Sequence, residues 1–218
     1  MPSRLPLFPL AVVLFPGEPM PLHIFEPRYR QMLVDCLAGD ERFGLTPDPA
    51  PRAATVGTVA RIRATEPLGD GRSNIVVLGE RRFAVRALLE EGTPYLVASI
   101  EEFDDQPGTA PLPQERQQLR ELGDAYRDAL RVLVDSSAEP DPWDEDPETF
   151  THQVAAFAEV DVEGKARLLA LRSTRERCNG LVQLLPPLVR EAQRRADVHL
   201  RARTNGKGHH GHDIITDG

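Results

Sequence analysis

Hydrophobic and polar positions follow two different patterns, one before and one after the segment from Glu101 to Pro113. Before it, from Leu5 to about Phe103, short β-favouring runs alternate with turn residues, which predicts mostly strands. After it, apolar residues recur at every third or fourth position, which predicts amphipathic helices. The segment itself is acidic and then rich in Pro and Gly, a composition that marks a linker. We therefore expect an α+β protein with its strands first and its helices last.

One helix interrupts the predicted strands. Pro27 suits the first helical position, Tyr29, Met32 and Cys36 recur at helical spacing, and Gly39 serves as the C-terminal cap. About seven short strands with one inserted helix favour a small closed barrel. The predicted strands are Arg4–Leu10, Val12–Phe15, Met20–Ile24, Phe43–Thr46, Val56–Glu66, Asn74–Leu78, Phe83–Leu89 and Tyr95–Ile100, with Gly79 separating two of them.

The second half predicts a small helical bundle followed by a tail. The expected helices are Gln114–Val134, Thr149–Ala158, one capped by Asp161 that ends at Leu171, and one from Thr174 to about Leu200 that Pro186-Pro187 interrupts. The acidic stretch between the first two of these helices is predicted to be irregular, and Trp143 is expected to pin it to a surface. The predicted divisions are a barrel over residues 1–105, a helical subdomain over 106–200 and a disordered tail over 201–218.

Composition narrows the classes of function. With 40% hydrophobic and 28% charged residues and a net charge of -8, the chain reads as a soluble globular protein, and its acidic balance argues against nucleic acid as a partner. The prolines near the N-terminus leave no uninterrupted apolar run of the signal-peptide type, and no apolar run elsewhere is long enough to span a bilayer. Cys36 and Cys178 lie far apart in the sequence, and neither has a neighbouring Cys or His at metal-ligand spacing, so we expect a cytoplasmic protein. The lack of a long apolar run predicts that it does not bind a membrane.

The stretch from Leu5 to Leu33, LPLFPLAVVLFPGEPMPLHIFEPRYRQML, carries a family resemblance. Phe8-Pro9-Leu10, Phe15-Pro16-Gly17 and the segment from Pro21 to Tyr29 follow in the order seen at the start of the N-terminal substrate-binding domain of Lon proteases. Further similarities, in register, are Gly57-Thr58, Asp70-Gly71 and Gly79-x-x-Arg82-Phe83. The resemblance covers the chain to about Leu200 and implies a PUA-like β pseudobarrel with a C-terminal helical bundle.

The same resemblance implies a function. The chain resembles a stand-alone recognition element that binds unfolded or exposed apolar protein segments in a cleft between barrel and bundle. The resemblance also implies an adaptor in protein quality control, with a separate protease or chaperone as a further candidate partner. A small-molecule or RNA-binding module is the alternative, because PUA-like barrels bind RNA.

The sequence lacks the chemistry of the protease and ATPase modules that full Lon proteases carry. A phosphate-binding loop needs two glycines, a Lys and then Ser or Thr. Gly164-Lys165 has Glu159 in the place of the first glycine and Ala166 in the last position. The only other lysine, Lys207, lies in the tail, so a Ser-Lys dyad has no scaffold. We expect no enzyme activity and no catalytic residues.

Candidate binding residues gather in the segment from His23 to Tyr29. It combines aromatic groups with acidic and basic ones at His23, Phe25, Glu26, Arg28 and Tyr29. Each also has a structural explanation: Glu26 as a helix cap, Tyr29 on the core stripe, and Arg28 paired with a nearby carboxylate. Both explanations stay open at this stage.

Arg82 and Phe83 form a second candidate contact, because Arg and aromatic side chains are enriched at interaction hot spots. A solvated strand edge is the alternative. His209, His210 and His212 lie close together in the tail, but they have neither Cys partners nor a framing fold. We therefore expect no metal and no cofactor.

Overall fold

The computed structural model describes residues 3–206, which form six strands and five helices. Among these residues, no helix is both long enough and apolar enough to cross a membrane. The predicted α+β class is confirmed. The elements are β1 (Ser3–Pro9), β2 (Pro19–Ile24), α1 (Pro27–Leu37), β3 (Arg42–Thr46), β4 (Val56–Pro67), β5 (Ser73–Leu89), β6 (Leu96–Phe103), α2 (Pro113–Leu133), α3 (Pro147–Phe157), α4 (Val162–Ala170) and α5 (Thr174–Gly206).

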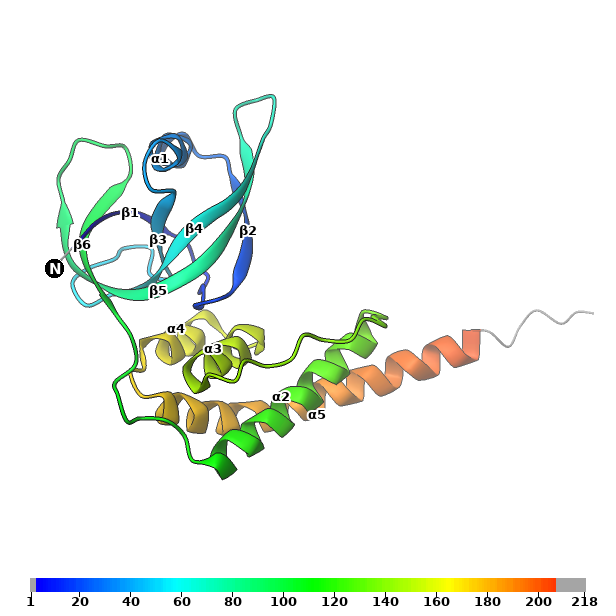
Figure 1. The fold of residues 1–218 in the computed structure, drawn as a ribbon. Helices are drawn as coiled ribbons and strands as arrows, with labels where there is room; N and C mark the ends of the chain where they lie inside the picture. Colours follow the sequence, from blue (N-terminus) through cyan, green and yellow to red (C-terminus); the bar gives the residue numbers. More distant parts are fainter. Residues whose placement is uncertain (1–2, 207–218) are drawn as a thin grey trace, which may run out of the picture.

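The strands form one curled mixed sheet in the order β2-β5-β4-β3-β1-β6, with an additional pairing of β5 to β6. Strands β1 and β3 are parallel, and the other pairs are antiparallel. The pairings from β1 through β3, β4, β5 and β6 return to β1, so five strands meet in a ring. Strand β2 is added beside the first half of β5. Figure 1 shows α1 at one end of this curled sheet and α3 and α4 at the other.

Strand β5 runs unbroken through Gly79, where the sequence predicts a break, so that prediction is wrong. The N–H of Gly79 donates to Glu18 O at 2.9 Å, and its C=O accepts from Gly17 N at 2.8 Å. A Cβ at this position would lie 2.1 Å from Phe15 O. Glycine is therefore used here for close backbone approach and not for a turn.

The predicted strand from Val12 to Phe15 is also absent. These residues follow an irregular path between β1 and β2, although Val13, Leu14 and Phe15 are buried. The Leu14 C=O accepts a hydrogen bond from Thr58 Oγ1 at 2.6 Å. Apolar β-favouring residues here serve packing, without a neighbouring strand to complete a ladder.

The hydrophobic core has a part inside the curled sheet and a part among the helices. Inside the sheet, Tyr29 and Met32 of α1 pack with residues such as Phe43 and Ile62. Val13 and Phe15, from the segment before β2, belong to the helical part of the core. The N-terminal segment therefore joins the sheet to the helices.

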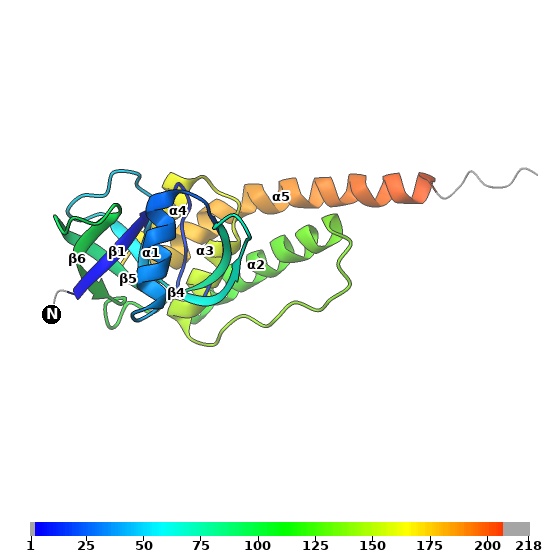
Figure 2. The same ribbon diagram turned by 90° about the horizontal axis from the view of Figure 1, so that it is seen from above.

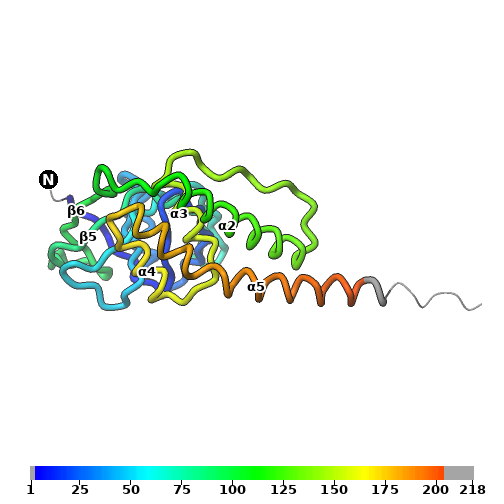
Figure 3. The backbone as a smooth tube through the Cα atoms, turned by 90° about the horizontal axis from the view of Figure 1, so that it is seen from below, coloured from blue at the N-terminus to red at the C-terminus, as the bar shows by residue number. Residues whose placement is uncertain are grey.

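Helices α2 and α5 pack against each other and extend away from the sheet (Figures 2 and 3). Helix α5 continues through Pro186 and Pro187 to Gly206, so the predicted interruption is wrong. Each proline removes one backbone hydrogen bond, and the packing along α2 holds the helix together across the gap. The remaining tail, with His209, His210 and His212, lies outside the described residues.

Candidate functional site

Strand β2 presents one row of side chains to solvent. Its exposure alternates, with Pro19, Pro21 and His23 exposed and Ile24 buried in the core, as expected for a half-buried strand. Phe25 follows directly and is 59% exposed, although it is a large apolar side chain. The row therefore leads from Pro19 at one end of β2 to Phe25 at the other.

His23 is fixed in place by its neighbours. Its Nδ1 lies 2.8 Å from Asn74 Oδ1 on β5, and Asn74 Nδ2 donates to Glu66 Oε2 on β4 at 3.1 Å. The His23 ring stacks on Phe25, with ring centroids 6.0 Å apart. Two of the predicted binding residues, His23 and Phe25, are therefore brought together at the surface.

Glu26, Arg28 and Tyr29 mark the start of α1. Glu26 occupies the N-cap position but makes no side-chain cap; instead its carboxylate accepts from Arg28 Nε at 2.9 Å. The Arg28 guanidinium lies 4.5 Å from the centroid of the Tyr29 ring. Tyr29 is buried and packs on Phe8. Glu26 and Arg28 therefore reach solvent, whereas Tyr29 supports them from the core.

A groove of about 440 Å³ lies at the Pro19 end of β2. Its walls come from the segment before β2, from α2 and α3, and from the irregular stretch that precedes α3. Among its lining residues are Pro16, Glu18, Pro19, Arg127, Trp143 and Phe157. Burial raises the pKa of Glu18, and a hydrogen bond from Phe15 N opposes that rise. The groove is where sheet and helices meet.

Trp143 lines one side of this groove. Its Nε1–H donates to Asp124 Oδ1 at 2.7 Å, and the Arg127 guanidinium lies 4.1 Å from its ring centroid. A Cβ at position 123 would come within 3.3 Å of the indole, so Gly123 leaves room for it. The prediction that Trp143 pins the acidic stretch to a surface is confirmed.

Arg82 and Phe83 lie in the interior. Arg82 is 1% exposed, and its guanidinium donates to Leu169 O at 3.0 Å and pairs with Asp105. Phe83 is fully buried beside Leu7 and Val85. In this structure neither side chain reaches a surface where a partner could bind. Arg82 connects the sheet to the helices, and Phe83 fills the core of the sheet. Neither belongs to the exposed row of β2.

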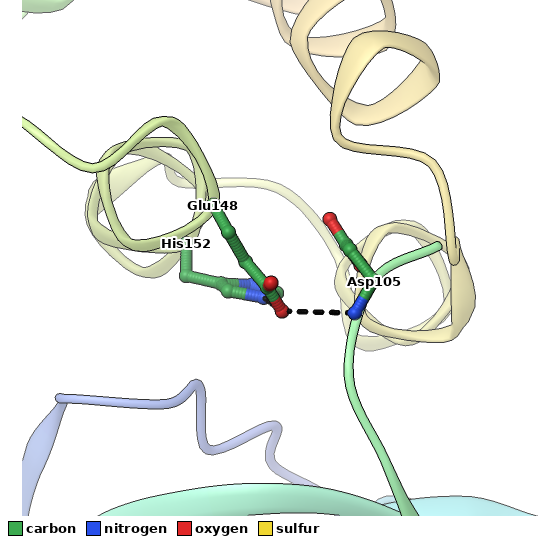
Figure 4. Close-up of side chains that lie close together, drawn as sticks. All are labelled: Asp105, Glu148 and His152. Atoms are coloured by element: carbon green, nitrogen blue, oxygen red, sulfur yellow. Dashed lines mark hydrogen bonds and ion pairs between the residues drawn. The ribbon is translucent and has the colours of Figure 1, made fainter. Parts of the chain in front are cut away.

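Asp105, Glu148 and His152 place three ligand-type atoms within 4.8 Å of one another (Figure 4). The carboxylates, however, already serve the protein. Asp105 pairs with both Arg82 and Arg177, and Glu148 accepts from Arg82 at 3.1 Å and from Asp105 N at 3.3 Å. Two carboxylates with two guanidiniums are neutral together, so a cation would have to displace an arginine. The cluster fits a structural role better than a metal site.

His152 in this cluster is buried, and neither ring nitrogen has a hydrogen-bond partner among the described residues. Its Nε2 lies 3.7 Å from Glu148 Oε1, which is too long for a hydrogen bond. Burial lowers the pKa of His152 to about 4, and the charges of Arg177 and Arg82 act in the same direction. The imidazole is therefore neutral at pH 7.

Sequence reasoning missed Asn74 and Glu66 because each is an ordinary polar residue of an alternating strand. Their proximity to His23 depends on strand register, which pairs His23 with Asn74 and Asn74 with Glu66. It also missed Phe157, whose helical spacing indicates a core residue but which is 40% exposed in the groove.

The chain belongs to the family of the ATP-dependent protease La (LON) substrate-binding domain, whose model matches residues 4–186. The Lon protease 2 of Myxococcus xanthus is 28% identical over an aligned length of 201 residues, and the alignment covers 85% of this chain and 24% of that protein. The Lon protease of Anaeromyxobacter dehalogenans is 28% identical over an aligned length of 200 residues, and the alignment covers 85% of this chain and 23% of that protein. The chain thus spans about a quarter of the length of these relatives.

Solved structures share the fold. The crystal structure of a Lon N-terminal domain protein from Xanthomonas campestris superposes with a TM-score of 0.63 at 24% identity, covering 84% of this chain and 99% of that one. The N-terminal domain of a Mycobacterium avium complex Lon protease gives a TM-score of 0.63 at 17% identity, covering 84% of this chain and 98% of that one. The relation to Lon N-terminal domains is therefore confirmed.

Proposed function

We propose that this chain is a non-catalytic module that recognises unfolded or exposed apolar protein segments. One observation carries the proposal: the exposed row of β2 leads from the groove beside Trp143 to the exposed Phe25 ring. Exposed apolar surface bordered by polar groups marks binding surfaces on soluble proteins. Family membership supports the same function.

The dimensions suit an extended segment. From Pro19 to Phe25 the chain advances six residues, which is about 20 Å in a strand. A bound segment of about six extended residues would cover this distance. Its apolar side chains would enter the groove at one end and contact Phe25 at the other, with Glu26 and Arg28 beside them.

The edge of β2 disfavours a different mode, in which the segment pairs as a further strand. Among the described residues, β2 pairs with β5 alone. Pro19 and Pro21 have no N–H, so Met20, Leu22 and Ile24 supply the donors to β5. The outer edge then has the N–H of His23 as its single strand donor. A strand edge with so few N–H donors resists the addition of another strand. We therefore place the bound segment over the exposed side chains of β2.

We further propose that the module is an adaptor in protein quality control that works with a separate protease or chaperone in the cytoplasm. Membership of a substrate-binding family supports the adaptor role, and two free, buried cysteines suit a reducing compartment. We assign the curled sheet to the PUA-like pseudobarrels because its pairings return from β6 to β1.

The test is fluorescence anisotropy of a labelled, unfolded peptide titrated with the purified chain. We expect saturable binding that weakens about tenfold in Phe25→Ala and in Phe157→Ala, because each change removes an aromatic contact of about 1 to 2 kcal/mol. Val134→Ala is the control, since Val134 is 73% exposed but lies at the far end of α2.

Thermal unfolding must first show that both aromatic variants remain folded at the assay temperature. Unchanged affinity in both variants would contradict binding along the β2 row. Binding of structured RNA at moderate salt, in place of peptide, would instead favour the RNA-binding alternative.

A further inference from the structure

The outer face of β2, β5 and β4 carries two rows of side chains in register. Each row crosses all three strands, and a shallow hollow of about 470 Å³ lies over them. A register shift in β4 between Ile62 and Ala64 brings the β4 side chains into line. The polar row is His23, Asn74 and Glu66, and the apolar row is Pro21, Val76 and Ala64.

The chemistry of the polar row determines which way its hydrogen bonds run. An ionised carboxylate only accepts, so Asn74 must give an amide hydrogen to Glu66 and present Oδ1 to His23. His23 Nδ1 must then donate to Asn74 Oδ1. The Glu66 end of the row therefore offers an acceptor, the second carboxylate oxygen.

Glu66 also carries an unpaired charge. Among the described residues it forms no ion pair, whereas Glu80 and Asp70, on neighbouring segments, are paired with arginines. Arg63, on the same strand, is exposed and forms no ion pair with Glu66 either. An unpaired carboxylate beside an exposed apolar row is complementary to a cationic group attached to an apolar one.

We propose that this face selects protein segments in which an Arg or Lys side chain lies two positions from an apolar residue. The proposal rests on the proposed function and specifies its substrate. Side chains on one side of an extended segment repeat every two residues, and the two rows are also two residues apart on β2. A segment lying over β2 and β5 would thus direct its basic side chain along the polar row to Glu66 while the apolar side chain contacts Val76.

The experiment compares two labelled peptides that differ at one position. One contains Arg two residues from Leu, and the other has neutral citrulline in place of the Arg. We expect the parent chain to bind the Arg peptide about fivefold more tightly, the effect of one exposed ion pair near 1 kcal/mol. Glu66→Gln should abolish this preference without changing the affinity for the citrulline peptide.

Glu90→Gln is the matched control. It makes the same change in net charge at an exposed carboxylate after β5, and it should keep the preference. Val76→Ser should weaken the binding of both peptides equally, because it removes the apolar contact that they share.

Equal affinity of the parent for both peptides, or an equal loss for both in Glu66→Gln, would overturn this inference and leave general segment binding intact. Failure of both peptides to bind the parent would overturn the proposed function as well. The two proposals are therefore separately testable.

Discussion

At the scale of single residues, Asp105 determines how sheet and helices are joined. Its side chain is 4% exposed and contacts Arg82 of β5 and both Arg177 and Thr174 of α5. Burial alone would raise the pKa of Asp105, but hydrogen bonds from Arg177 and Thr174 and the charges of both arginines lower it to about 2. This carboxylate thus pairs with two buried guanidiniums, and Glu148, which also pairs with Arg82, supplies the second negative charge.

Asp105→Asn should lower the free energy of unfolding by about 3 to 5 kcal/mol, because it leaves two buried cations without their shared anion. Urea denaturation at pH 7 measures this loss. Asp104→Asn is the control: Asp104 pairs with Arg81 at the surface, and its loss should cost less than about 1 kcal/mol. Similar values for the two variants would contradict the role given to Asp105.

At the scale of elements, β5 depends on Gly79 for its continuity. The backbone of Phe15 crosses the strand where a side chain would stand. This crossing brings Phe15 into the helical core and positions the start of β2, so one glycine affects both the strand and the groove.

Gly79→Ala should destabilise the fold by about 3 kcal/mol, because the methyl group must displace the Phe15 carbonyl. The midpoint of thermal unfolding should fall accordingly. Gly69→Ala, in the turn between β4 and β5, meets no atom within 4 Å and should change stability by less than about 0.5 kcal/mol. A tolerated Gly79→Ala would mean that the Phe15 segment can move freely.

At the scale of the whole molecule, stability should depend on pH through His152. The pKa of His152 is about 4 in the folded chain, whereas that of an exposed histidine is about 6.5. Between these values the unfolded chain binds a proton that the folded chain does not, so stability falls as the pH drops from about 6.5 to about 4.

The expected loss across this window is roughly 2 to 3 kcal/mol, measured by urea denaturation at pH 7, 5.5 and 4.5. Asp105 affects stability at lower pH. Because its pKa is depressed to about 2, its stabilisation is lost only below about pH 4. His152→Phe should remove most of the slope. An unchanged slope in that variant would assign the pH dependence to other groups.

The sequence alone determined the kinds of elements and several of their ends. A short β-favouring run predicted the strand that presents His23, and helical spacing predicted the α1 stripe through Tyr29. Asp161 was identified as a cap, which its bond from Gly164 N at 2.7 Å confirms. The motifs before Leu33 also identified the family. All of these signals are local, because capping and periodicity depend on residues a few positions apart.

Only the tertiary structure decided which residues are buried by distant parts of the chain. Arg82 carries the same sequence signal as an exposed strand residue, yet Asp105 and the carbonyls before α5 enclose it. The same holds for Gly79, which resembles a turn until the Phe15 backbone is in place. The row of His23, Asn74 and Glu66 likewise exists only through strand register. Pairing and burial join residues far apart in sequence, and local patterns carry no record of such partners.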